Sequence, residues 1–394
     1  MTTPDWTGGA AAALPTDAAD AALFGRVHVP GRGPRVVTVR GGEIVDVSDA
    51  FPTARALTEN ADPATALRAA AGPVLGSVDA LLANTVPEHR DRTAPWLLSP
   101  IDLHVVKAAG VTFPVSMIER VIEERAGGDS SRAEENRATI AAVLGDDLQS
   151  LVPGSEEAAR LKHYLQEQGL WSQYLEVGIG PDAEVFTKAP VLSTVGTAVD
   201  VGVSEISAWN NPEPEVVLVV ASQGRIVGAT LGNDVNLRDV EGRSALLLPR
   251  AKDNNASAAL GPFVRLFDDR FTIEHVRSAQ VVLRIEGADG FVLDGTSDLG
   301  LISRDPESLV AQTLGPHHQY PDGFVLYLGT LFAPTADRDG PGQGFTHHLG
   351  DIVRISAPRL GTLVNRVAHS ESLPPWTYGI ADLIADLAAQ HAER

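Results

Sequence analysis

The chain of 394 residues contains no cysteine, which excludes disulfide bonds, thiolate metal ligands and cysteine nucleophiles together. Lysine is also scarce, since Lys107, Lys162, Lys188 and Lys252 are the whole supply. Where arginine is the usual cation, a lysine indicates that a compact or titratable charge is wanted. No stretch approaches the roughly 20 apolar residues of a membrane span, and the first 25 residues carry no basic signal-type segment. We therefore expect a cytoplasmic protein.

Positive charge is in the minority throughout the chain. Lys and Arg number 31 against 51 Asp and Glu, so the formal net charge is −20. A polyanion or an anionic membrane surface would repel such a body, and we expect neither nucleic acid nor membrane as a partner. A small anionic substrate remains compatible, because a metal ion or an arginine can invert the sign inside one pocket.

Composition divides the chain into three segments. Residues 1–22 are Ala-rich and interrupted, which predicts a flexible, loosely attached arm. Residues 23–95 combine β-branched runs with an Ala- and Leu-rich stretch, which predicts a small N-terminal domain of strands and helix. The linker-like VPEHRDRTAPW precedes a main domain over 96–394 with a helical insertion at about 116–170. The 44% hydrophobic content is enough for a large core.

The helical insertion is followed by a strand-rich remainder. SMIERVIEERA has the apolar period of a helix, with Ser116 as its predicted N-cap and Glu119 at the capping-box offset. Two more helices are predicted at about 131–144 and 155–169. From residue 184 onward, short β-branched runs alternate with Gly and Pro until a closing helix. This pattern predicts a sandwich, barrel or β-roll.

The most informative stretch is NPEPEVVLVVASQGRIVGATLGNDV, which has the pattern of a hairpin. Glu213 and Glu215 lie two apart on one strand, so their carboxylates share a face. A turn at 222–224 places Glu215 opposite about 230–231 and brings Asp234 to the same open end. Three carboxylates there repel one another unless a cation lies among them, and oxygen ligands favour Mg²⁺, Mn²⁺ or Ca²⁺. The alternative is three solvated acids in an acidic protein.

Two cationic residues follow the hairpin. Arg238, four residues after Asp234, has the reach to clamp a substrate carboxylate, or it pairs with Asp239 or Glu241. Lys252 follows an apolar run, and a partly desolvated lysine beside a metal can titrate low enough to act as a base. The alternative for Lys252 is an ordinary surface lysine.

Four separated motifs, in order, resemble the fumarylacetoacetate hydrolase family over about residues 95–370. They are EPEVVLVV…GRIVGATLGNDVNLRD, LPRAKDNN…LGPF, YPDGFVLYLGTLFAP and HLGDIVRISAPRLGTLVNRV. The resemblance implies an α+β fold, with a mixed β-roll or sandwich catalytic domain and a small, mainly β N-terminal domain. It implies one Mg²⁺ or Mn²⁺ on Glu213, Glu215 and Asp234. It also implies a catalytic role for Lys252 and substrate contacts from Arg238 and Thr330, in a homodimer or homotetramer.

One departure from the family pattern bears on the reaction. Hydrolase and decarboxylase members carry a His and, three residues later, a Glu that together activate water. Here Ser116 stands at the His place while Glu119 keeps the Glu place. Chains of this length with GVTFPVSMIERVIEE resemble sugar-acid dehydratases, which convert 2-keto-3-deoxy-D-xylonate or -arabinonate to 2-oxoglutarate semialdehyde. An acylpyruvate-type C–C hydrolase or oxaloacetate decarboxylase is the alternative, and a ligand-binding protein that has lost activity is another.

For the dehydratase, we expect Lys252 to take the C3 proton and Glu119 or Glu123 to protonate the departing C4 hydroxide. At i and i+4, both glutamates lie along one helix edge. The alternative is a solvated edge on which they pair with Arg120 and Arg125. Helix position alone does not separate these readings.

Three more residues are expected around the substrate. Ser116 is placed beside it by the family position of the missing histidine. Thr330 is expected to bond the substrate carboxylate, or else its own backbone. Lys188 either lines the mouth of the site or is a surface lysine. The pairs His317–His318 and His347–His348 lack the spacing of a zinc site.

Overall fold

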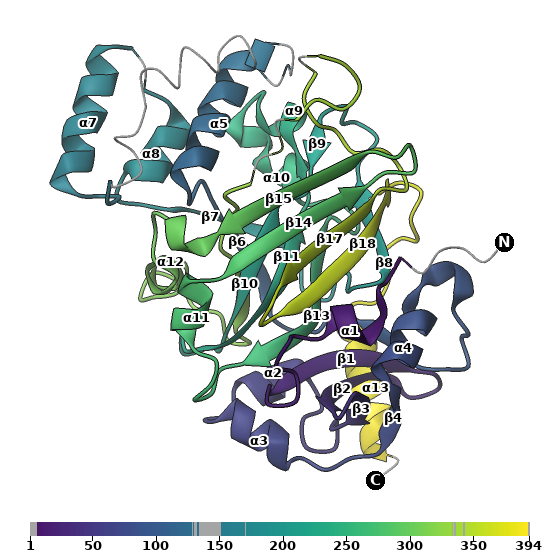
Figure 1. Cartoon of the computed structure of the whole chain (residues 1–394). Coiled ribbons are helices and arrows are strands. Elements are labelled where there is room, and N and C mark those ends of the chain that lie inside the picture. Colours follow the sequence, from purple (N-terminus) through teal and green to yellow (C-terminus); the bar gives the residue numbers. More distant parts are fainter. Residues whose placement is uncertain are drawn as a thin grey trace.

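The computed structural model describes residues 6–127, 129, 132–133, 151–169, 171–332, 334, 336–341 and 343–392. Two β-sheets pack against each other in the middle of the molecule, as Figure 1 shows. The helices α5, α7 and α8 lie together at one end, and the N-terminal strands lie at the other end. The described part of the chain is thus the mixed α/β sandwich that the sequence predicts.

The larger sheet has 11 strands within the described residues. Ten of them follow the order β4-β3-β2-β1-β13-β11-β10-β16-β6-β7, and β5 pairs with β1 beside this path. Most neighbours are antiparallel, whereas β16 and β6 run parallel. The strands span Leu23–Val29 (β1), Gly33–Arg40 (β2), Glu43–Asp46 (β3), Val74–Ser77 (β4), Trp96–Leu98 (β5), Val105–Gly110 (β6), Glu184–Ala189 (β7), Pro214–Val220 (β10), Ile226–Asp234 (β11), Ala258–Leu266 (β13) and Phe324–Tyr327 (β16).

The smaller sheet has five strands in the order β15-β14-β17-β18-β8. Strand β14 contacts β10, and β17 and β18 contact β11 and β13, so the two sheets face each other across one core. A separate pair, β9 (Asn210–Asn211) and β12 (Asn236–Leu237), closes the loops beside the hairpin. The strands of the smaller sheet span Val199–Val203 (β8), Gln280–Glu286 (β14), Val292–Asp298 (β15), Ile352–Ala357 (β17) and Gly361–His369 (β18).

Strand β10 is buried along its whole length, which explains its unbroken PEVVLVV sequence. Val216 and Leu218 point into the core between the sheets, while Val217 and Val219 point into a second core on the other face of the large sheet. β-Branched residues favour such a two-sided strand. Each fully buried Val or Leu contributes about 1.5–3 kcal/mol. The end of β10 is therefore a rigid place from which to present carboxylates.

The first helix of the insertion begins earlier than predicted. Helix α5 spans Pro114–Ala126 with Phe113 at the N-cap, and Pro114 occupies the first turn that suits a residue without an N–H. Ser116 is therefore not the N-cap, and its hydroxyl donates to the Phe113 carbonyl at 2.9 Å. The predicted helix at 155–169 is α7 (Glu156–Glu167), capped by Ser155. The prediction for 131–144 falls almost entirely outside the described residues.

The N-terminal segment differs from the predicted loose arm from residue 6 onward. Trp6 and Ala13 are buried, the latter in α1 (Gly9–Ala13). Asp17 accepts two hydrogen bonds from Arg265, at 2.6 and 2.8 Å. Small alanine side chains let this segment lie close against the body, a packing that composition alone did not reveal.

The N-terminal strands continue the large sheet across the predicted boundary near 95. Strand β1 pairs with β13 through Leu23↔Arg265 and Phe24↔Val264. The closing helix α13 (Ile380–Ala392) packs against β2, where Gln390 donates to the carbonyl of Pro34 at 3.3 Å. Backbone hydrogen bonds thus join the two predicted domains in one sheet. The division into two domains near residue 95 stays a prediction.

The remaining helices are short, and none of the described helices has the length and apolar character needed to cross a membrane. They lie at the ends and edges of the two sheets (Figure 1). They span Ala54–Thr58 (α2), Pro63–Ala69 (α3), Val78–Thr85 (α4), Gln173–Ile179 (α8), Arg238–Glu241 (α9), Leu248–Lys252 (α10), Ile273–Arg277 (α11) and Pro306–Thr313 (α12).

Candidate metal centre and substrate cavity

The β10–β11 hairpin brings the three predicted carboxylates to one end of the large sheet. Glu215 pairs with Gly232, and the Asp234 amide donates to the Glu213 carbonyl at 3.1 Å. The sequence pattern placed Glu215 opposite about 230–231, which is one to two residues before its actual partner Gly232. A register shift between Val219 and Val220, next to the turn, accounts for the difference.

The triad of Glu213, Glu215 and Asp234 is buried, and each residue offers a carboxylate oxygen within 4.8 Å of the others. The Glu215 carboxylate accepts a hydrogen bond from the Gly329 amide at 2.6 Å. Burial and then the charges of Asp234 and Glu213 raise the pKa of Glu215 well above its ordinary value. Glu215 is thus the member of the triad that most needs a positive partner.

Two buried lysines balance the rest of the triad. The Lys252 ammonium, on α10, forms ion pairs with Glu213 and with Asp234, the latter at 3.2 Å. Lys188, on β7, lies 2.7 Å from Asp234 and donates to the Val235 carbonyl at 3.0 Å. Lys188 is fully buried, so its interpretation as a surface lysine is wrong. It does not line the cavity within the described residues and supports Asp234 from behind.

The donor set fits a hard divalent cation. All three groups are carboxylates, the ligand type that Mg²⁺ and Mn²⁺ prefer, and burial excludes the solvent that would otherwise screen them. Within the described residues, neither lysine bonds Glu215, although Lys252 lies close enough to lower its pKa in part. A cation held by the triad would remove the repulsion that raises this pKa.

A small cavity of about 30 Å³ opens onto the triad. Its volume matches about one water molecule, far less than a five-carbon acid needs. Its wall comes from β6, β7, β10, β11, α5, α9, α10 and the segment after β16. The residues that line it are Ala109, Gly110, Val111, Ser116, Arg120, Glu184, Phe186, Glu213, Glu215, Asp234, Glu241, Lys252, Gly329 and Thr330.

Glu184, at the start of β7, was missed by the sequence analysis. It faces Gly110 across the β6–β7 pair, and a Cβ on Gly110 would lie 2.0 Å from its Oε2. No hydrogen bond or ion pair joins its carboxylate to the rest of the described chain, and burial followed by repulsion from Glu241 raises its pKa to about 7. The sequence offered little indication of this role, because a single Glu at the start of a strand forms no recognisable motif with the three triad residues.

Glu241 and Arg120 were also missed as cavity residues. The Arg120 guanidinium lies 2.7 Å from Glu123 and 3.2 Å from Glu241, and it forms a further ion pair with Glu213. Burial, opposed in part by Arg120, raises the pKa of Glu241. The sequence pattern indicated Arg120 only as a pairing partner on a solvated helix edge, because helical periodicity does not show which neighbours approach that edge.

The two glutamates expected as acids lie on the far side of Arg120. Both are buried, and neither lines the cavity within the described residues. Glu123 pairs with Arg120 and with Arg238; although burial opposes the change, these cations lower its pKa. Glu119 lies 3.7 Å from Arg238. The solvated-edge alternative is therefore wrong about exposure, although the pairing of Glu123 with Arg120 that it included is present. Glu123 is held as an ionised anchor.

Arg238 is turned away from the cavity. Its Nε donates to Glu123 at 2.7 Å, its Nη1 donates to the Pro334 carbonyl at 2.9 Å, and its guanidinium lies 4.3 Å from the Trp209 ring. Pairing with Asp239 or Glu241, the alternative read from spacing, is not what the described residues show. A substrate contact from Arg238 stays a prediction.

Ser116 and Thr330 do line the cavity, as expected. The Thr330 hydroxyl accepts from the Phe332 amide at 3.1 Å, so the local backbone bond that was the alternative is present. Of the histidine pairs, His347 bonds Asp351 at 3.1 Å. Neither pair belongs to a metal-binding group among the described residues, although His369 lies near two exposed acids, Glu205 and Glu371.

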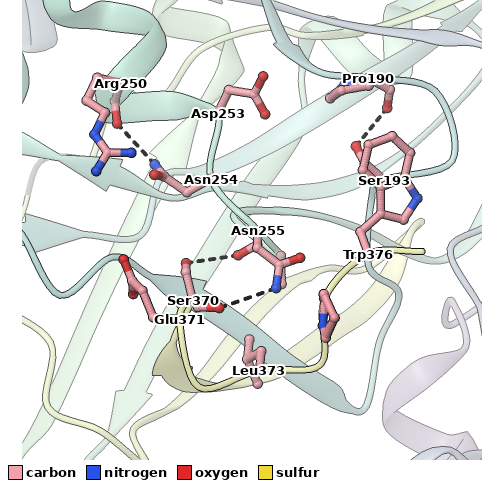
Figure 2. Close-up of a pocket in the computed structure, with 12 residues that line it drawn as sticks. Pro190, Ser193, Arg250, Asp253, Asn254, Asn255, Ser370, Glu371, Leu373 and Trp376 are labelled. Atoms are coloured by element: carbon pink, nitrogen blue, oxygen red, sulfur yellow. Dashed lines mark hydrogen bonds between the residues drawn. The ribbon is translucent and has the colours of Figure 1, made fainter. Parts of the chain in front are cut away.

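A much larger hollow of about 790 Å³ lies on the other side of the Lys252 segment. Figure 2 shows Asp253, directly after Lys252, with Arg250 on one side and Trp376 on the other. Asn255 ties this wall together, since its amide donates to the Ser370 carbonyl at 3.3 Å. None of the three triad carboxylates lines this hollow, so it is separate from the candidate metal centre.

Comparison with known proteins agrees with this geometry. Residues 181–368 match the family model described as fumarylacetoacetate (FAA) hydrolase C-terminal. A probable 2-keto-3-deoxyxylonate dehydratase from Haloferax volcanii is 32% identical over 202 residues, which are 51% of this chain and 66% of that protein. A 2-dehydro-3-deoxy-D-arabinonate dehydratase from Saccharolobus solfataricus is 31% identical over 184 residues, or 47% and 58%. The chain thus spans less than two thirds of each curated relative.

Solved structures show the same fold. A 2-keto-3-deoxy-D-arabinonate dehydratase complexed with magnesium and 2,5-dioxopentanoate superposes with a TM-score of 0.60. It is 22% identical, and the match covers 88% of this chain and 98% of that one. Residues 181–368 contain the triad, Lys252, nearly all of the smaller sheet, and strands β7, β10, β11, β13 and β16 of the larger sheet. Residues 181–368 therefore match the fumarylacetoacetate hydrolase family model, and the chain shares the fold of these solved structures.

Proposed function

We propose that this protein is a divalent-cation-dependent hydro-lyase that converts a 2-keto-3-deoxy-pentonate, derived from xylonate or arabinonate, to 2-oxoglutarate semialdehyde. The buried triad with Lys252 at its edge carries the proposal. No histidine lines the cavity within the described residues, so the imidazole needed to activate water for C–C hydrolysis is not there. Two dehydratases among the relatives support this choice.

Glu213, Glu215 and Asp234 would hold the cation, Mg²⁺ or Mn²⁺. When bound, it would polarise the 2-keto group and favour loss of a proton from C3. Lys252 is the proposed base for that proton. Burial alone would lower the pKa of Lys252, yet the charges of Asp234 and Glu213 outweigh burial and raise it. With these carboxylates neutralised, burial dominates and frees the amine to accept a proton.

Glu184 is the proposed acid, in place of Glu119 and Glu123. Its carboxyl faces the cavity without a bonded partner among the described residues, and a pKa of about 7 keeps a proton available near neutral pH. The C4 hydroxide would leave as water with this proton, while Lys252 holds the proton from C3. Tautomerisation of the unsaturated product then gives the aldehyde at C5.

The test is a coupled assay on 2-keto-3-deoxy-D-xylonate, in which an added dehydrogenase oxidises the semialdehyde. We expect turnover with Mg²⁺, loss of turnover with EDTA, and recovery when Mg²⁺ or Mn²⁺ is restored. If EDTA did not reduce turnover, the proposed requirement for a metal ion would be wrong. Faster turnover of acetopyruvate or oxaloacetate would replace the dehydratase with the hydrolase or decarboxylase alternative.

The proposal includes a cytoplasmic homodimer or homotetramer with a small anionic sugar acid as its partner. The family resemblance supports the assembly, and the substrate's origin in sugar breakdown supports the location. Size-exclusion chromatography with light scattering measures the first directly. A monomeric mass of 41.6 kDa at micromolar concentration would contradict it.

A further inference from the structure

Arg120 brings a guanidinium into the cavity from helix α5. Its Nη1 lies 2.7 Å from Glu123 and 3.2 Å from Glu241, and its Nη2 is bonded to Glu213. Burial opposes its charge, but Glu123, Glu241 and Glu213 together raise the pKa of Arg120 further above its ordinary value. Arg120 is thus a permanent cation that contacts one carboxylate of the triad, that of Glu213.

The cavity offers few positive groups to an anionic substrate. Among the described residues that line it, only Arg120 and Lys252 are cations, against five carboxylates. Lys252 is held by Glu213 and Asp234, and the proposed mechanism needs it as a base. Arg238, the clamp expected from the sequence, is fixed to Glu123 and stacked on Trp209 outside the cavity wall.

The size of the cavity indicates which side chain must move. About 30 Å³ cannot admit a five-carbon acid, so some lining group has to yield its place. The backbones of β6, β10 and β11 are fixed in a sheet whose strands are almost wholly buried. Arg120 is a long side chain on a separate helical layer, and its bond to Glu213 competes directly with any cation there.

We propose that Arg120 is a substrate-positioning residue that exchanges Glu213 for the substrate's carboxylate when the divalent cation binds. Glu123 and Glu241 remain its anchors and hold the planar fork toward the cavity, where it forms paired hydrogen bonds with the carboxylate. This inference rests on the proposed metal site. It assigns the recognition of the acid group to α5, a helix outside the matched family domain.

The test measures binding, so it does not depend on turnover. Calorimetry first records Mn²⁺ binding to the whole protein. It then records the affinity of the Mn²⁺-loaded protein for 2-oxopentanoate and for the neutral 2-oxopentanamide. The variants are Arg120→Met, Arg120→Lys and, as the matched control, Arg125→Met, which changes an exposed arginine of the same helix.

We expect Arg120→Met to bind Mn²⁺ at least as tightly as the wild type, because Glu213 loses a competitor. Its affinity for 2-oxopentanoate should fall about 30- to 100-fold, with the amide changed less than about threefold. Arg120→Lys keeps the charge without the fork and should lose about tenfold for the acid alone. Arg125→Met should match the wild type for both compounds.

Two results would overturn the inference, and they differ from a failure of the metal site. If acid and amide weaken equally in Arg120→Met, Arg120 is a structural anchor only. If Arg120→Met does not fold, the test rests on Arg120→Lys. Wild-type affinity of that variant for 2-oxopentanoate would rule out paired hydrogen bonds between Arg120 and the carboxylate. A wild-type protein that binds no Mn²⁺ would instead remove the proposed metal site, on which the inference stands.

Discussion

The two ends of the cavity are built in different ways. At one end, Glu215 and Asp234 project from two strands that are almost wholly buried, and Glu213 directly precedes the first of them. At the other end, α5 supplies Arg120, which is held by ion pairs with Glu123 behind it and with Glu213 and Glu241 from other elements. Strand geometry fixes the first group whatever its charge state, whereas the second group depends on which charges face it.

This difference separates metal binding from substrate binding. A carboxylate set on a rigid sheet keeps its geometry while its repulsion is relieved by a cation. An arginine held by several carboxylates can lose one partner and keep the others. Variants at the triad should therefore change metal affinity, whereas variants at the helical end should change substrate affinity or stability.

The largest effect is expected from Glu215→Gln. The amide keeps the shape and the bond from Gly329 but cannot serve as an anionic ligand. Mutating a residue that only supports a metal ligand typically lowers metal affinity by roughly 10- to 100-fold. Because Glu215 is itself a proposed ligand, we expect a larger loss of Mn²⁺ affinity and no turnover. Because Glu215 is strained by its neighbours' charge, the metal-free variant should melt no lower than the wild type. Calorimetry and melting in EDTA measure both, and wild-type Mn²⁺ affinity would refute the triad.

Glu184→Gln should separate proton donation from metal binding. We expect turnover to fall about 10²- to 10³-fold at pH 7 while Mn²⁺ affinity stays near that of the wild type. Glu241→Gln is the control, because it changes a neighbouring cavity carboxylate that, unlike Glu184, forms an ion pair with Arg120. Equal turnover by Glu184→Gln and the wild type would show that Glu184 is not the acid.

Glu184 also sets a pH dependence of stability. Its pKa is raised to about 7 in the folded protein, so the folded state keeps a proton that the unfolded chain loses near pH 4.5. Its contribution is complete below pH 4.5 and is lost as the pH rises to about 7. The loss amounts to roughly 3 kcal/mol of unfolding free energy. Urea unfolding of the metal-free protein measures this, and Glu184→Gln should show a shallower decline; parallel curves would contradict it.

At the helical end, Glu123→Gln should cost more stability than Glu119→Gln. Glu123 pairs with both Arg120 and Arg238, and removing its charge leaves two buried guanidinium groups short of a partner. We expect a loss of about 2–4 kcal/mol, against about 1 kcal/mol or less for Glu119→Gln. Denaturant unfolding of the two variants side by side tests this, and the reverse order would mean that Arg238 depends on Glu119.

The smallest effect is expected from Thr330→Val. The hydroxyl accepts one bond from the Phe332 amide and faces the cavity. Losing it should raise KM about fivefold, in line with about 1 kcal/mol for one hydrogen bond, with kcat little changed. Steady-state kinetics on the pentonate substrate would show this. An unchanged KM would mean that Thr330 only shapes its own turn.

The sequence predicted the strand-borne part of the site well and the helix-borne part poorly. A period of two fixes which face Glu213 and Glu215 share, and the hairpin then brings Asp234 beside them, so spacing was enough. Even a bulge near the turn displaced the register by only one to two residues. Burial of the triad, by contrast, required knowledge of both sheets.

For α5, periodicity assigned Glu119 and Glu123 to a polar edge, but it carried no information on what packs over that edge. The partners Glu213, Glu241 and Arg238 lie about 90 to 120 residues away along the chain. Glu184 depends on pairing between β7 and β6 across the whole helical insertion. Such contacts are set by tertiary packing rather than local pattern, which is why these residues were missed or misplaced.

The pairing of β1 with β13 has a consequence for attempts to shorten the chain from its N-terminus. Strand β13 is buried throughout and lies next to β11, which ends at Asp234. A protein trimmed to begin near residue 96 would leave the backbone groups at residues 264–266 of this apolar strand unpaired, and an exposed strand edge is a template for intermolecular aggregation. The N-terminal segment thus covers part of the edge of the strand beside the triad, and a shortened protein should retain it.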